Sequence, residues 1–215
     1  MRENHGLRVE EVEPGLVGVG LDPSFAIGQR ALKVERLLWD CLPLAEDGAE
    51  DVDVIAISHP HYYTAMVETA ERLDARILLH EADREWVQRP SARIDFWSGD
   101  RLRVSDGLEL VHLGGHFAGG TVCLWRDGSD GRGALLSGDI VQVVADRDWV
   151  SFMWSYPNSI PLPPQEVERM RAVLETLDFD RVYGAWWDTV VPEDAKAKVL
   201  RSADRYVDAV TNGRR

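Results

Sequence analysis

The order of apolar and polar residues predicts an α/β chain that begins with a strand meander. Residues 8–12 and 16–21 have short β-like patterns separated by Pro14-Gly15, a turn signal typical of a hairpin. A short apolar run follows at 37–39, and the apolar stretch 52–57 is typical of a buried strand. Between these two strands, residues 45–51 are predicted to form an acidic surface loop.

A helix is expected after these strands. Residues 64–73 place apolar side chains at helical spacing, and the strand pattern returns at 76–79, so this part is a strand-helix-strand unit. A hairpin is expected within 101–113, and further strands are expected at 121–125, 134–136 and 181–183.

Proline marks the late helices. Pro163-Pro164 predicts a helix that runs to Leu177, and Pro192 predicts a C-terminal helix that ends near Val210. The segment 149–164 is rich in aromatic residues, serine and proline, and it is expected to be a long loop that covers something.

Composition narrows the class of protein. The chain has 215 residues, 45% of them hydrophobic, which favours one folded domain over residues 1–215. A net charge of −13 repels phosphate backbones, so no nucleic-acid partner is expected. The sequence has neither a membrane-spanning run nor an apolar leader, so a cytoplasmic location is expected. With only 2 cysteines, a metal site would need histidine and carboxylate ligands.

Three polar elements each follow a predicted strand: His59-Pro60-His61, the glycine-flanked His116, and Ser137-Gly138-Asp139. Two histidines at positions i and i+2 of an extended chain project to the same side, which suits chelation. Each element alone has an ordinary explanation: two surface histidines, a hairpin corner, and a turn aspartate. Only the three elements together indicate one particular kind of site.

In this order, the three elements resemble the metallo-β-lactamase superfamily, and the resemblance covers nearly the whole chain. It implies a four-layer αββα sandwich, with two mixed β-sheets flanked by helices and a metal site in the cleft between the sheets. The family's first-metal ligands correspond to His59, His61 and His116, and Asp139 matches the residue that usually bridges two metals.

The chain departs from the family pattern at the second metal. The family motif is His-x-His-x-Asp-His, whereas Tyr63 and Thr64 stand in its last two positions. The usual late histidine is also absent, because no histidine follows His116 and the corresponding region contains Trp186. Since all the losses fall on one site, the resemblance implies a single retained metal.

Three imidazoles and a carboxylate suit one zinc ion per chain, and iron is the alternative metal. Zinc with an open position would activate water, with Asp139 or Tyr63 handling protons as the catalytic residues. If all four ligands bind tightly, the metal is structural instead.

The leading hypothesis is a hydrolase that acts on a small ester, thioester, lactone or amide. A non-catalytic ligand-binding protein of the same fold and a mononuclear iron dioxygenase acting on a thiol-type substrate remain alternatives. A small molecule is the expected partner, and a homodimer is expected from base rates. The predicted substrate-binding residues are Tyr62, Trp154, Tyr156, Asn158, Trp186 and Trp187.

Overall fold

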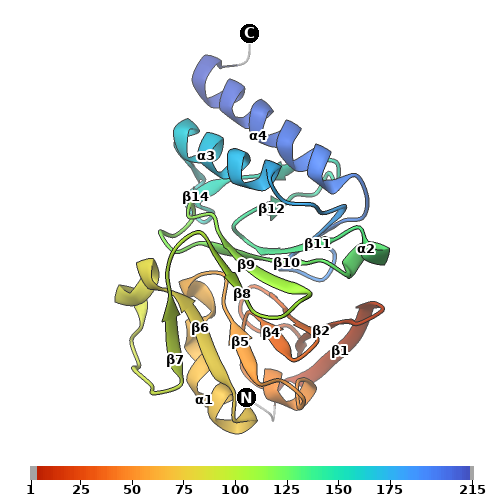
Figure 1. Cartoon of the computed structure of the whole chain (residues 1–215), viewed down its shortest axis with the longest axis vertical. Coiled ribbons are helices and arrows are strands. Elements are labelled where there is room, and N and C mark those ends of the chain that lie inside the picture. Colours follow the sequence, from red (N-terminus) through yellow and green to blue (C-terminus); the bar gives the residue numbers. More distant parts are fainter. Residues whose placement is uncertain (1–3, 214–215) are drawn as a thin grey trace.

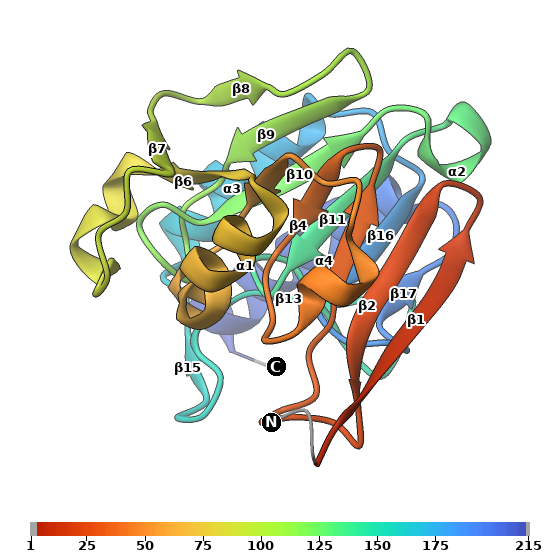
Figure 2. The same ribbon diagram turned by 90° about the horizontal axis from the view of Figure 1, so that it is seen from below.

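The computed structural model describes residues 4–213 and has four layers: helix, sheet, sheet and helix (Figure 1). The predicted αββα sandwich is therefore confirmed. Helix α1 (Met66–Leu73) and the 3₁₀ turn η1 (Ala45–Gly48) cover the outer face of the first sheet, as Figure 2 shows from below. Helices α3 (Pro164–Glu175) and α4 (Ala195–Asn212) cover the outer face of the second sheet.

The first sheet has 7 strands in chain order. It is antiparallel from β1 to β4 and parallel from β4 to β7, so it is mixed, as predicted. Its strands are β1 (Gly6–Glu13), β2 (Leu16–Asp22), β3 (Ala31–Val34), β4 (Leu37–Trp39), β5 (Val54–Ala56), β6 (Arg76–His80) and β7 (Ile94–Trp97).

The second sheet has 6 strands in the order β17-β16-β11-β10-β9-β8. Only the β11–β16 pair within it is parallel. Its strands are β8 (Arg101–Arg103), β9 (Leu108–His112), β10 (Thr121–Trp125), β11 (Ala134–Gly138), β16 (Arg181–Gly184) and β17 (Val190–Val191). A short kinked helix, α2 (Gly128–Gly131), connects β10 to β11.

Alternation along each strand divides the core. On β3, Leu32 and Val34 face the second sheet, whereas Ala31 faces the layer of α1. Residues on the second sheet alternate in the same way, with Leu135 under α3 and Leu136 between the sheets. Period-two patterning therefore gives each sheet two buried faces, one against helices and one against the other sheet.

Three local predictions are wrong. The expected loop 149–164 contains β13 (Val150–Ser151), which pairs with β12 (Gln142–Val143), and a hairpin of β14 (Met153–Ser155) with β15 (Ile160–Pro161).

Within the expected acidic surface loop 45–51, Ala45 and Glu46 are buried in η1, where Glu46 pairs with Arg72. The helix expected from residue 64 begins at Met66, after a 3₁₀ turn, η2 (Pro60–Ala65).

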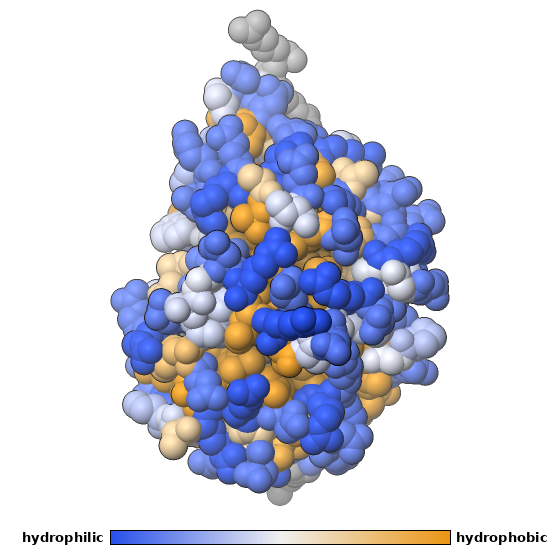
Figure 3. Space-filling model, in the orientation of Figure 1, coloured by the Kyte–Doolittle hydropathy of each residue, from blue (hydrophilic) through white to orange (hydrophobic). Residues whose placement is uncertain are grey.

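The face seen in Figure 3 is mainly hydrophilic, with apolar side chains visible between the polar ones across the middle of the molecule. Among residues 4–213, no helix is long and apolar enough to cross a membrane.

Candidate metal centre

His59 and His61 meet just after the end of β5. His59 is extended, with φ −170° and ψ 168°, and Pro60 then opens η2. The His59 Nε2 and His61 Nδ1 atoms lie 3.1 Å apart. The two imidazoles converge as predicted, but the cause differs: His61 lies in the first turn of η2 and does not continue an extended strand.

His116 reaches the same place from the glycine-rich turn between β9 and β10. Gly114 and Gly115 both have positive φ, and a Cβ at Gly120 would lie 2.3 Å from the Gly114 carbonyl oxygen, so a tight turn needs these glycines. The His116 Nδ1 atom lies 3.1 Å from the Met153 carbonyl and 3.0 Å from the Trp154 carbonyl.

This contact fixes the tautomer of His116. Since carbonyls only accept, Nδ1 must carry the proton, and Nε2 is left with a free lone pair. The His116 Nε2 atom is buried and has no hydrogen-bond partner. A metal ligand held through its other nitrogen by a backbone carbonyl has this arrangement.

Asp139 completes the cluster from the end of β11. Its Oδ2 lies 3.9 Å from the His59 Nε2 atom, and its Oδ1 accepts a long hydrogen bond of 3.5 Å from Gln29. The Tyr156 hydroxyl donates to the backbone carbonyl of Asp139 at 2.7 Å.

The ligand atoms of His59, His61, His116 and Asp139 all lie within 4.8 Å of one another. This set fits a metal: the spacing suits a shared ion, the donors are nitrogen and oxygen, and the unpaired Nε2 of His116 belongs to the set. The four residues come from the segments after β5 and β11 and from the turn between β9 and β10, so both sheets contribute to the site.

Burial controls the charges of the cluster. Desolvation lowers the pKa of His61 and His116, and it lowers that of His59 most strongly, so all three imidazoles are neutral at pH 7. Desolvation also raises the pKa of Asp139 to about 7. Neutral imidazoles are the form that binds metal, and a cation would compensate the buried carboxylate.

The two positions that depart from the family motif differ in their surroundings. Tyr63 is half-buried, and desolvation raises the pKa of its phenol well above the ordinary value, so it stays protonated. Thr64 is exposed. Neither residue belongs to the cluster of potential ligands.

The predicted substrate-binding residues fall into two groups. Tyr62 and Tyr156 adjoin the cluster: the Tyr62 ring lies 5.3 Å from the His59 ring, and the Tyr156 ring lies 5.2 Å from the His116 ring. Trp154 approaches the cluster through its backbone carbonyl, while its side chain is 55% exposed. Asn158 is exposed and donates to Ser155.

Trp186 and Trp187 lie after β16 and contact the first sheet. The Trp186 indole donates to the Ile27 carbonyl at 2.8 Å. Trp187 packs so closely over β2 that a Cβ on Gly18 or Gly20 would lie 2.7 or 2.9 Å from its ring. These two tryptophans join the two sheets at the end of the sandwich that carries the cluster.

Sequence reasoning missed two polar residues near the cluster. Asp40 follows β4 and accepts a 2.8 Å hydrogen bond from the Ser58 amide, while burial raises its pKa to about 8. Its position directly after an apolar strand, like that of Asp139, was the available signal. The other residue is Arg30, at the start of β3, which is only 2% exposed.

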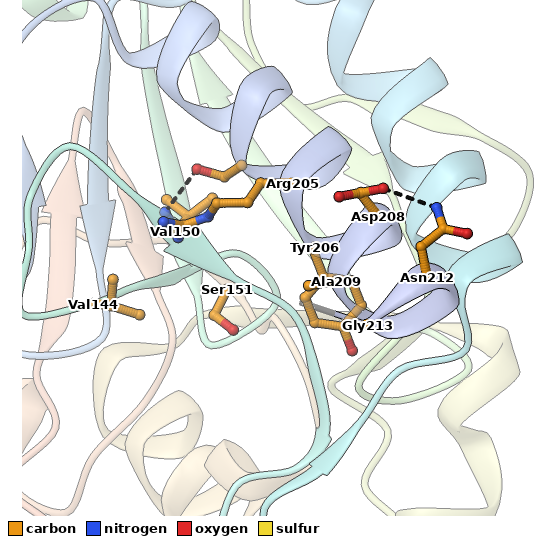
Figure 4. Close-up of a pocket in the computed structure, with 10 residues that line it drawn as sticks. Val144, Val150, Ser151, Arg205, Tyr206, Asp208, Ala209, Asn212 and Gly213 are labelled. Atoms are coloured by element: carbon orange, nitrogen blue, oxygen red, sulfur yellow. Dashed lines mark hydrogen bonds between the residues drawn. The ribbon is translucent and has the colours of Figure 1, made fainter. Parts of the chain in front are cut away.

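A cavity of about 840 Å³ lies elsewhere, between α4 and the β12–β13 hairpin (Figure 4). Tyr206 and Asp208 on α4 and Ser151 on β13 are among its lining residues. None of the predicted site residues lines this cavity.

No family model matches the chain. It is, however, 46% identical over 225 residues to YmaE of Bacillus subtilis (strain 168), an uncharacterized protein, with 99% of this chain and 82% of the relative covered. The chain belongs to the family of YmaE.

Comparison with solved structures shows which fold this chain has. A B3 metallo-β-lactamase with an active-site glutamic acid superimposes with a TM-score of 0.66 at 15% identity, covering 96% of this chain and 90% of that one. The Cronobacter sakazakii metallo-β-lactamase with a HARLDQ motif gives 0.64 at 15% identity, covering 95% and 93%. GOB-18 of Elizabethkingia meningoseptica gives 0.60 at 13%, covering 95% and 90%. This chain therefore has the metallo-β-lactamase fold.

Proposed function

We propose that this chain is a metal-dependent hydrolase that uses one metal ion to cleave a small ester, thioester, lactone or amide. Zinc is the first candidate for this metal. The observation that carries the proposal is the convergence of four ligand atoms within 4.8 Å. Tyr63 and Thr64, at the positions where the family has second-metal ligands, lie outside that cluster.

His59, His61 and His116 would hold the metal through neutral nitrogens, and His116 is oriented by the Met153 and Trp154 carbonyls. When bound, a divalent metal supplies Lewis acidity at a substrate carbonyl and lowers the pKa of a coordinated water. Because this chemistry needs an open coordination position, the three histidines would hold the metal and Asp139 would stay free to act as a base.

Asp139 is the proposed general base. Its Oδ2 lies 3.9 Å from the His59 Nε2 atom, so the carboxylate stands beside the position where a metal-held water would be activated. Tyr63 is the proposed hydrogen-bond donor to a substrate oxygen, because its raised pKa keeps the phenol protonated. Tyr156 holds the backbone of Asp139 and thereby positions the base.

Metal content tests the proposal directly. Elemental analysis of protein purified without added metal or chelator should find about one metal per chain in the wild type and none in His116→Ala. His112→Gln is the matched control, because His112 flanks the same glycine turn but bonds to the Ala118 carbonyl. Equal metal content in the wild type and His116→Ala would refute the site.

Activity separates the proposed hydrolase from its two rivals. Hydrolysis of an ester, thioester, lactone or amide panel that is lost in Asp139→Asn supports the proposal. Stabilisation by a ligand without turnover would instead indicate a binding protein. Oxygen consumption with a thiol by the iron-loaded protein would indicate a dioxygenase.

A further inference from the structure

Arg30 is a buried cation without a hydrogen-bonding partner. The residue is 2% exposed, and its Nε, Nη1 and Nη2 atoms are all buried and unpaired. Its backbone is fixed, since the Arg30 amide donates to the Ala185 carbonyl at 2.8 Å. Desolvation lowers its pKa only to about 10, so the guanidinium remains charged at neutral pH.

Strand alternation explains where this side chain lies. Leu32 and Val34 on β3 face the core between the two sheets, and Arg30 precedes Leu32 by two residues. The guanidinium therefore occupies the end of an apolar row, at the end of the sandwich where β4 and β5 lead into Asp40 and His59. Its neighbours include the rings of Trp187 and Tyr183, at 5.5 and 5.9 Å from the guanidinium carbon.

Aromatic rings do not replace a hydrogen-bond acceptor. A ring attracts the cation electrostatically, but the N–H groups of a guanidinium point outward in its own plane and still require acceptors. Asp188 and Glu10 act on Arg30 only through longer-range charge, and neither accepts a hydrogen bond from it. A buried charge left in this state is costly to the folded protein.

Tyr62 connects Arg30 to the metal centre. The Tyr62 hydroxyl is also buried without a partner. It interacts electrostatically with Asp40, Asp139 and Arg30, and its ring packs edge-on against His59. Arg30 and Tyr62 are therefore two buried, unpaired donors that act on each other electrostatically, and one of them contacts the cluster.

We propose that Arg30 and Tyr62 form a subsite for a carboxylate group of the substrate, placed next to the bond that the metal centre acts on. A carboxylate accepts two parallel hydrogen bonds from a guanidinium, and a phenol can donate a third. One carboxylate group carries a single charge that matches one guanidinium, whereas a phosphate group carries up to two. As a statement about substrate class, this inference rests on the proposed hydrolase function, but anion binding itself does not require turnover.

Access to the subsite involves the preceding segment, residues 23–29. Phe25 and Ile27 within it are exposed, at 41% and 65%, and the Trp186 indole holds the Ile27 carbonyl. Gln29 from the same segment reaches Asp139. Because Arg30 is buried, the proposed subsite requires this segment to move aside for a ligand, and such a movement would also change the 3.5 Å contact between Gln29 and Asp139.

The test uses succinate as the probe, with succinamide as the neutral analogue and inorganic phosphate as the competing anion. Calorimetric titration and thermal unfolding compare the wild type with Arg30→Met and Arg30→Lys. Arg36→Met is the matched control, because Arg36 is an exposed arginine paired with Asp53. We expect succinate to raise the Tm of the wild type and of Arg36→Met by several degrees, and succinamide to have no effect.

Arg30→Met should lose this shift, and Arg30→Lys should bind succinate at least tenfold more weakly, because lysine lacks the planar fork. Without ligand, Arg30→Met should unfold at the same or a higher temperature than the wild type, since an unpaired buried charge has been removed. If Arg30→Met does not fold, the loss in Arg30→Lys decides the question.

Equal succinate binding by the wild type and Arg30→Lys, no binding by the wild type, or tighter binding of phosphate would overturn the proposal. Repeating the titration in His116→Ala separates the two hypotheses. If His116→Ala lacks metal but still binds succinate, the subsite is supported even when no hydrolysis is found. If the wild type hydrolyses substrates with and without a carboxylate at the same rate, the subsite is overturned and the hydrolase proposal stands.

Discussion

The hydroxyl of Tyr156 donates a 2.7 Å hydrogen bond to the backbone carbonyl of Asp139. This bond ties the chain that follows β14 to the turn that follows β11, and the β14 end also supplies the carbonyls that face His116. One small hairpin therefore positions two of the four potential metal ligands.

Removing this hydroxyl should weaken metal binding more than it weakens the fold. Tyr156→Phe deletes one buried hydrogen bond, which costs about 1 kcal/mol of unfolding free energy. Loss of such a supporting contact should lower zinc affinity by about tenfold or more. Denaturant unfolding and zinc competition with a chelating dye measure the two effects. Tyr206→Phe, which loses a comparable bond to the Leu162 carbonyl, should change stability without changing zinc affinity.

Metal affinity should fall steeply as the pH drops below neutrality. Protonation of Asp139, whose pKa is about 7, removes the negative charge that favours a cation beside it, and at lower pH protons compete for the imidazole nitrogens, whose pKa values burial lowers. Zinc affinity measured between pH 5 and 8 should therefore rise with pH. In Asp139→Asn the part of the rise near pH 7 should disappear, and an unchanged profile would contradict the role of this carboxylate.

Without metal, the contribution of Asp40 to stability should decrease as the pH rises. Burial raises the pKa of Asp40 from 3.8 to about 8, so the folded chain holds a proton that the unfolded chain releases in this window. The contribution of Asp40 to the free energy of unfolding therefore falls between about pH 4 and pH 8 and levels off above pH 8. Asp40→Asn should flatten this slope in urea unfolding of the chelated protein, while keeping an acceptor for the Ser58 amide. If the slope of Asp40→Asn is as steep as that of the wild type, Asp40 is not the group that titrates.

Trp187 and the glycines of β2 should behave as one packed unit. Gly18→Ala places a Cβ 2.7 Å from the Trp187 ring, and such overpacking costs about 1–3 kcal/mol of unfolding free energy. Trp187→Leu should relieve the clash, so the double variant should be more stable than additivity predicts. Strict additivity in a double-mutant cycle would show that the two positions do not compete for space.

Much of the fold could be predicted because its strands and helices follow local patterns. The alternation of β9, the apolar run of β10 and the prolines before α3 and α4 act within a few residues, so the sequence carries them directly. Strand β3 was not predicted, because its 4 residues are stabilised by pairing with β2 and β4, which lie in other parts of the chain. The burial of Glu46 has the same origin, since its partner Arg72 comes from α1.

The candidate ligands could be predicted for a different reason. Histidine and aspartate residues that follow apolar strands can be seen in the sequence. The resemblance to a known family indicated that they form one metal site. Arg30 could not be found in this way, because an arginine directly before an apolar strand has many structural explanations. Only tertiary structure places its guanidinium between the sheets without an acceptor.

The carbonyls that set the tautomer of His116 belong to the backbone of Met153 and Trp154, not to their side chains. Any amino acid except one that distorts the hairpin would present the same oxygens. Evolution can therefore exchange the residues at these two positions, one of which carries an exposed indole, without disturbing the ligand beneath. The orientation of His116 and the side chains that this segment displays are therefore specified by separate parts of the same short segment.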